Sequence, residues 1–119
     1  LSPNLDQETF SPSCKLYREA KHLIDIGYNS QDISIQEIAD KLGVHRSYLS
    51  SIFKDFHKIS PKEYLLEVRM NRANELLKTT NQPIKIIAYS VGYLDPLHFS
   101  KAFRQYYDCS PSQYRTSKQ

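Results

Sequence analysis

Two stretches of the sequence could do recognition chemistry, because they combine hydrogen-bond donors with few carboxylates. Placed on a helix at about 100° per residue, the first presents outward Arg46, Ser47, Ser50, Ser51 and Lys54. The second presents Leu97, Ser100, Lys101 and Arg104, flanked by His98. Carboxylates come only near the helix ends, at Asp55 and Asp108. A DNA major groove admits a helix whose N-terminal half carries donors, and it repels acidic side chains. The pattern therefore favours two DNA-reading faces over solvated faces, which would normally include Glu and Asp.

Phosphate contacts are predicted on the same side of each module. The N-termini of two short helices offer unpaired N–H groups and the positive end of a dipole, and cationic side chains pair with phosphates. The candidates are Ser34, Gln36, Lys54, Lys58, Lys85, Arg104 and Arg115. Each of these side chains, taken singly, is equally consistent with a solvated one.

Catalytic and metal-binding constellations are not evident. The four histidines form no pair at metal-ligand spacing. Neither Cys14 nor Cys109 has a nearby histidine or a Gly-rich turn, and two cysteines are too few for a disulfide scaffold. The sequence therefore predicts no enzyme, no bound metal and no cofactor.

Apolar residues at helical spacing indicate the elements that position these side chains. Helices are expected over about 14–27, 35–42, 46–57, 61–78, 83–91, 96–106 and from 111. Ser34 with Glu37 and Ser60 with Glu63 form predicted capping boxes, and Pro61 and Pro111 stand at first helical positions. β-branched alternation is scarce. The predicted fold is all-α, with about seven helices.

An internal repeat organises these helices. Ile35, Ile38, Ala39, Leu42 and Gly43 recur 49 residues later as Ile84, Ile87, Ala88, Val91 and Gly92. Beyond the glycine the offset becomes 50, because the second copy has one extra residue near Leu94. Each copy is a short helix, a glycine turn and a longer helix, which is the helix-turn-helix pattern. Gly43 and Gly92 are predicted to adopt the left-handed conformation.

The repeat divides the chain into parts. We expect a linker, or a remnant of a longer chain, over 1–13, a first helix-turn-helix subdomain over 14–57, a connecting helix over 58–80 and a second subdomain over 81–119. The helix from Pro61 to Lys78 would be roughly 27 Å long, and one turn of B-DNA advances roughly 34 Å. A spacer of this length could place the two reading helices in successive major-groove segments. Arg69 falls within its apolar arc and is expected to be buried beside a carboxylate, the alternative being that it binds phosphate.

Composition limits the class of protein. The chain has 119 residues, of which 39% are hydrophobic and 24% charged, and it begins with Leu1 rather than Met, as expected of a piece of a longer chain. Residues 1–40 carry three Lys/Arg and seven Asp/Glu, whereas residues 41–119 carry thirteen and six. No apolar run approaches the ~18 residues of a membrane span, and no signal peptide is apparent. The basic part favours a polyanionic partner, and a cytoplasmic location is expected.

Three stretches carry a family resemblance: IQEIADKLGVHRSYLSSIFKDF, SPKEYLLEVRMNRANELLKTT and IKIIAYSVGYLDPLHFSKAFRQYYDCSPSQYR. Over about residues 14–116 the chain resembles the DNA-binding module of the AraC/XylS family of bacterial transcription regulators. The resemblance implies base-reading positions at Arg46, Ser47, Ser50, Ser51, Pro96, Leu97, His98 and Lys101. One departure is His45, where the family commonly places a better helix cap such as serine.

The expected function is sequence-specific binding of double-stranded operator DNA by the C-terminal module of a transcription regulator. The resemblance implies an effector-binding or dimerisation domain in the full-length protein, and RNA polymerase as a partner if the protein is an activator. The alternative is a helical protein-interaction module that binds no DNA. An enzyme is disfavoured, although a similar module accompanies alkyl-transfer DNA repair proteins. RNA binding is disfavoured because no aromatic-bearing sheet is predicted.

Overall fold

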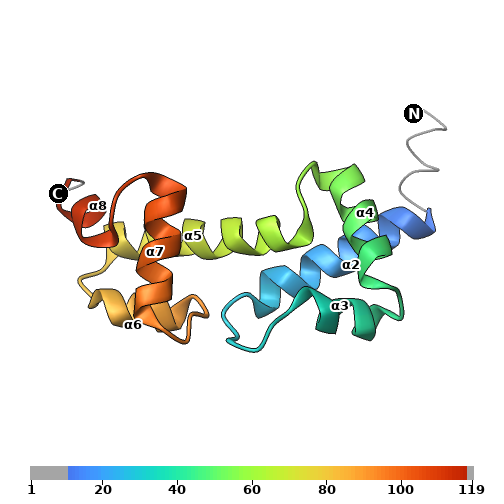
Figure 1. The fold of residues 1–119 in the computed structure, drawn as a ribbon, viewed down its shortest axis with the longest axis horizontal. Coiled ribbons are helices and arrows are strands. Elements are labelled where there is room, and N and C mark those ends of the chain that lie inside the picture. The colour runs from blue at the N-terminus through green and yellow to red at the C-terminus, as the bar shows by residue number, and fades with distance from the viewer. Residues whose placement is uncertain (1–10, 118–119) are drawn as a thin grey trace. The chain divides into compact units, whose positions relative to one another are not determined.

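The computed structural model describes residues 11–117, and this part of the chain forms seven helices and no strand (Figure 1). The first three helices are α2 (Pro12–Gly27), α3 (Ile35–Leu42) and α4 (Arg46–His57). They are followed by α5 (Pro61–Thr79), α6 (Ile84–Ser90), α7 (Pro96–Tyr107) and α8 (Pro111–Ser117). The predicted all-α fold with two helix-turn-helix motifs is confirmed.

Three helices begin at the same two-residue signal, a serine followed by proline. In each, the serine Oγ accepts a hydrogen bond of 3.1 Å from the main-chain N–H three residues later, the pairs being Ser11–Cys14, Ser60–Glu63 and Ser110–Gln113. Glu63 and Gln113 also accept from the serine N–H, at 3.3 and 3.1 Å, which completes both capping boxes. The expected linker over 1–13 lies outside the described residues except for its last three, and there α2 begins at Pro12 rather than at Cys14.

The capping box predicted at Ser34 is only half formed. The Ser34 Oγ accepts from the Glu37 N–H at 3.1 Å, as expected. The Glu37 carboxylate, however, pairs with Lys41 at 3.6 Å, one turn further along α3. The Ser34 hydroxyl therefore caps α3 without the reciprocal bond, because an i,i+4 ion pair attracts the glutamate side chain.

The described chain groups into two compact units. The first contains the described residues up to Gly27 together with Ile33–Leu65, and the second contains Tyr28–Asp32 and the described residues from Leu66 onward. The first turn of α5 thus belongs to one unit and the rest of α5 to the other, whereas the sequence suggested a separate connecting helix. The predicted boundaries at 57 and 80 stay a prediction.

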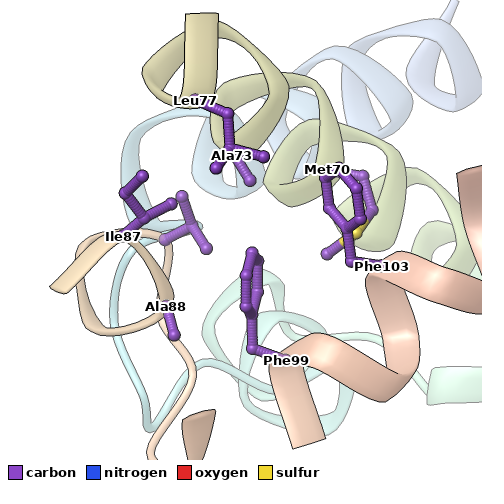
Figure 2. Packing of buried hydrophobic residues seen from close by; sticks show 8 residues of the cluster. Met70, Ala73, Leu77, Ile87, Ala88, Phe99 and Phe103 are labelled. Carbon is purple, nitrogen blue, oxygen red and sulfur yellow. The ribbon is translucent and has the colours of Figure 1, made fainter. Parts of the chain in front are cut away.

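Each unit has its own apolar core. In the first unit, α2, α3 and α4 bury Ala20, Ile24, Ile35, Ile38, Ala39, Leu49 and Phe53. In the second unit, α5, α6 and α7 direct apolar side chains toward one another, as Figure 2 shows for Met70, Ala73, Leu77, Ile87, Ala88, Phe99 and Phe103. Leu49 and Phe53 occupy the same repeat positions as Phe99 and Phe103, and all four are fully buried. These four buried side chains hold each reading helix against its unit.

Both turn glycines have positive φ, as predicted, with values of 70° at Gly43 and 97° at Gly92. Their surroundings differ. A Cβ added at Gly43 would meet nothing within 4 Å, whereas one added at Gly92 would lie 2.5 Å from the Tyr28 carbonyl oxygen and 2.9 Å from Arg69 Nη2. Glycine is required at position 43 only because of the positive φ. At position 92 it is required for the positive φ and also because a side chain would collide with neighbouring atoms.

Arg69 accounts for the crowding at Gly92. The Arg69 guanidinium donates to the Tyr28 carbonyl at 2.9 Å and to the Ser30 carbonyl at 3.0 Å, and it lies 5.4 Å from the centre of the Tyr93 ring. The expectation of a carboxylate partner is wrong: main-chain oxygens of the segment after α2 accept these bonds. Burial lowers the pKa of Arg69, but these carbonyls solvate the charge. Arg69 ties residues 28–32 to the second unit.

Candidate nucleic-acid interface

The outward face of α4 is exposed where base contacts were predicted. Arg46, Ser47, Ser51 and Lys54 are exposed, and Ser50 is half-buried beside the core. The helix begins at Arg46 although its N-cap, His45, makes no side-chain hydrogen bond to it. The Arg46 side chain and the first main-chain N–H groups of α4 are therefore available to acceptors on a ligand.

The outward face of α7 has the same layout and different chemistry. Leu97, His98, Lys101 and Arg104 are exposed, whereas Pro96 and Ser100 are half-buried. The Asp95 side chain caps this helix by accepting from the Leu97 N–H at 2.9 Å, and its other oxygen lies 3.9 Å from His98 Nε2. The start of α7 thus contains a carboxylate that partly neutralises the dipole.

Both faces carry positively charged side chains that form no ion pair within the described chain. Arg46 and Lys54 on α4 and Lys101 and Arg104 on α7 form no ion pair with another residue between positions 11 and 117, and neither does Lys85 at the start of α6. Three other cations of the described chain are in ion pairs, namely Lys21 with Asp25 at 2.9 Å, Lys41 with Glu37 at 3.6 Å and Arg72 with Glu75 at 3.1 Å, whereas Lys15, Arg18, Lys62 and Lys78 are not. Unpaired cations beside exposed donors suit a polyanion that carries acceptor groups.

The remaining phosphate candidates already make contacts within the chain. Ser34 keeps its hydroxyl hydrogen available while its oxygen caps α3, and Gln36 donates to Asp40 at 2.9 Å. Lys58 follows α4 with φ of 73°, and its Nζ donates to the Asp55 carbonyl at 3.2 Å. Lys58 is therefore at the C-terminal end of α4, away from the predicted base-reading end.

Arg115 differs from every other candidate because its guanidinium is engaged by three carbonyl oxygens. It donates to Gln82 at 2.7 Å, Thr80 at 3.2 Å and Leu77 at 3.3 Å. These oxygens surround the C-terminus of α5 and the turn into α6, where carbonyls have no partner within the helix. A phosphate would compete with these bonds for Arg115. The sequence contains no local signal of this contact, because the residues are more than 30 positions apart.

The groups with shifted pKa values are not among the predicted base-reading or phosphate-binding residues. Burial and a 2.5 Å hydrogen bond to Asp25 raise the pKa of Tyr64 to about 12. Burial also raises the pKa of Tyr93 and of Tyr106. Within residues 11–117, no cluster of three or more His, Cys, Asp or Glu side chains could hold a metal ion, and no helix is long and apolar enough to span a membrane.

Comparison with known proteins agrees with this geometry. A family model described as a helix-turn-helix domain matches residues 38–117. The C-terminal domain of AraT, a response regulator from Geobacillus stearothermophilus, is 36% identical with a TM-score of 0.85, covering 90% of this chain and 88% of that one. A transcriptional regulator from Chromobacterium violaceum, described as having an AraC-type DNA-binding domain, is 32% identical with a TM-score of 0.74, covering 89% of this chain and 94% of that one. The chain belongs to the AraC-type helix-turn-helix family.

A longer relative gives the context of this AraC-type domain. The Msm operon regulatory protein of Streptococcus mutans is 42% identical over 109 residues, which cover 91% of this chain and 39% of that protein. The chain thus spans about two fifths of that relative's length. The chain is an AraC-type DNA-binding domain, as the resemblance predicted.

Proposed function

We propose that this AraC-type domain recognises an asymmetric operator by inserting the N-terminal halves of α4 and α7 into major-groove segments. The observation that carries the proposal is the set of four cations without ion pairs on the two repeated outward faces, Arg46 and Lys54 on α4 and Lys101 and Arg104 on α7. Each face is held by a buried pair of side chains, Leu49 and Phe53 or Phe99 and Phe103. Rigid support of a reading helix lowers the entropy cost of binding.

Base-reading and phosphate-binding roles fall to different residues. Base reading is assigned to Arg46, Ser47, Ser50 and Ser51 on α4 and to Pro96, Leu97, His98 and Lys101 at the start of α7. Phosphate binding is assigned to Ser34, Gln36, Lys54, Lys58, Lys85 and Arg104. Serine and arginine can donate to base acceptors directly or through water, whereas phosphate contacts set register without reading sequence.

Arg115 is assigned instead to fastening the end of α5 to α8. Its three hydrogen bonds to carbonyl oxygens support this role over the phosphate contact expected from sequence. Arg115→Ala should lower the melting temperature and leave the salt dependence of DNA binding unchanged. Lys54→Ala, the matched surface control, should leave the melting temperature unchanged and reduce the salt slope by about one unit. A reduced slope with normal stability in Arg115→Ala would restore the phosphate assignment.

The biological role follows from the family and from the name of the Streptococcus mutans relative, which is an operon regulatory protein. We infer that this domain brings a longer regulator to its operator in the bacterial cytoplasm. The rest of that regulator would carry effector-binding or dimerisation functions, and RNA polymerase would be a partner if the regulator activates transcription.

The deciding experiment is selection of binding sites from random duplex DNA by this chain, at two salt concentrations. Because two different reading helices are joined covalently, we expect one chain to select two unlike half-sites about one helical turn, roughly 10 bp, apart. A short palindrome bound only by a dimer of the chain would contradict the asymmetric arrangement. Binding without any sequence preference would contradict the function itself.

A further inference from the structure

The start of α7 exposes an unusual amount of apolar surface. Leu97 is 77% exposed and Leu94 is 75% exposed, and these are the two most exposed large hydrophobic residues of the described chain. They lie three positions apart, on either side of the Asp95–Pro96 step that opens α7. A single exposed leucine is ordinary, but two at one end of a reading helix place apolar atoms where a ligand would meet them.

Leu94 is the residue by which the second repeat differs in length from the first. Between the turn glycine and the reading helix, the first copy has Val44 and His45, and the second has Tyr93, Leu94 and Asp95. The exposure of Leu94 means that this extra residue adds nothing to the apolar core. The insertion is therefore explained by contact with something outside the domain more readily than by packing.

The residues on both sides of Leu94 are held in place. The Tyr93 ring packs edge-on against Phe99, with ring centres 5.5 Å apart, and lies over the Arg69 guanidinium. Asp95 accepts the capping hydrogen bond from the Leu97 N–H, and Pro96 fixes its own φ. Leu94 is thus presented from a short segment anchored at both ends, so little conformational entropy would be lost when it meets a ligand.

The apolar group that a major groove offers to such a surface is the C5-methyl group of thymine. Pro96 has no main-chain N–H to donate, and the Leu97 N–H is taken by Asp95. The first contacts of α7 are therefore poor in donors and rich in methyl groups. The opposite holds for α4, whose first residues are Arg46, Ser47 and Tyr48.

We propose that Leu94 and Leu97 together form a thymine-methyl reader, which makes Leu94 a specificity-determining residue. This inference rests on the proposed DNA-binding function and adds a prediction about sequence. The half-site read by α7 contains two thymines, one contacted by each leucine. Each methyl contact should contribute about fourfold to affinity, as expected from ~0.8 kcal/mol per buried carbon.

The test uses the duplex obtained from the random-DNA selection. A second selection with Arg46→Ala identifies the half-site read by α4, and the other half-site is then assigned to α7. Each thymine of the α7 half-site is replaced singly by deoxyuridine, which removes the methyl group and leaves base pairing unchanged. Dissociation constants are measured for the unaltered chain, for Leu94→Ala, for Leu97→Ala and for the control Ile26→Ala, whose residue is 63% exposed on α2.

We expect two deoxyuridine substitutions to weaken binding by the unaltered chain, each about fourfold. Leu94→Ala should abolish one penalty, Leu97→Ala should abolish the other, and Ile26→Ala should retain both. Melting temperatures of all three variants should match that of the unaltered chain, because the truncated side chains are exposed. A selected α7 half-site without thymine, or Leu94→Ala with both penalties intact, would overturn the proposal while leaving sequence-specific binding established. Loss of all sequence preference in the selection would instead refute the proposed function.

Discussion

The two helix-turn-helix units share a packing pattern and differ in what they present outward. Leu49 and Phe53 of α4 have the same burial as Phe99 and Phe103 of α7. At the helix starts, however, His45 supplies no capping bond and precedes a free arginine, whereas Asp95 caps α7 between two exposed leucines. The comparison teaches that the fold constrains the inward positions of a reading helix and leaves its outward positions free to differ.

The turns of the two units give a second contrast. Their main-chain hydrogen bonds correspond, since Val44 donates to Ala39 at 3.1 Å and Tyr93 donates to Ala88 at 3.0 Å. Only the second turn is crowded, because the Tyr28 carbonyl and Arg69 approach Gly92. Equivalent glycines should therefore tolerate substitution to different degrees.

The largest effect is expected from Gly92→Ala. Positive φ costs an alanine on the order of 1–2 kcal/mol, and overlap with the Tyr28 carbonyl and Arg69 adds a similar amount. We expect the free energy of unfolding to fall by about 3 kcal/mol, measured by urea denaturation. Gly43→Ala is the matched control and should cost only about 1 kcal/mol, because its added Cβ meets nothing. If the free energy of unfolding falls equally in the two variants, the atoms around Gly92 move aside without a loss of stability, and the prediction is wrong.

Arg46→Ala should have the next largest effect, on DNA binding. If Arg46 donates two hydrogen bonds to guanine, its loss costs ~1–3 kcal/mol and relaxes base preference at that position. Pro96→Ala changes the equivalent residue of α7 and should alter base preference less than Arg46→Ala does, since proline has no donor to lose and offers a base only an apolar contact. The measurement is a repeat of the random-DNA selection with each variant. If Arg46→Ala weakens binding to specific and to random DNA equally, Arg46 contacts phosphate and does not read a base.

Replacing His45 would give α4 the cap that α7 already has. His45→Asp should stabilise the domain by about 1 kcal/mol, because its carboxylate can accept from N–H groups that His45 leaves without a side-chain partner. The same negative charge would lie beside Arg46 and should weaken DNA binding. His45→Ser provides the control, since it offers a cap without charge and should gain stability while binding normally. Weakened binding by both variants would indicate that His45 itself contacts DNA.

The smallest effects are expected where the reading helices end. Lys58 and Asp108 follow α4 and α7 with φ of 73° and 62°. Replacement by glycine should raise the free energy of unfolding by about 0.5–1 kcal/mol, and more at Lys58, because aspartate tolerates this conformation better than lysine. Thermal unfolding measures the gain. A larger gain from Asp108→Gly than from Lys58→Gly would contradict this explanation.

Much of the domain could be predicted from local patterns in the sequence. The repeat, the glycine turns and the serine–proline starts at Ser60 and Ser110 all depend on residues a few positions apart. Hydrogen bonds within one helix or turn close over such short distances, so their signals are contiguous in the chain. The same signal at Ser11–Pro12 also begins a helix, although it falls within the segment expected to be a linker.

The tertiary structure decided which distant groups those elements bring together. The helical spacing of apolar residues shows that α4 and α7 must pack. It does not show that residues 28–32 belong to the second unit, where Tyr28 and Ser30 accept from Arg69. Likewise, the sequence predicts Arg115 to be a surface cation, and only the folded structure shows that it donates to carbonyl oxygens at the C-terminus of α5. A guanidinium can donate to any correctly placed oxygen. Every residue has a main-chain carbonyl, so the sequence does not show which carbonyl will accept the hydrogen bond. The charge of Arg69 and Arg115 was therefore readable in the sequence, whereas their partners depended on the folded chain.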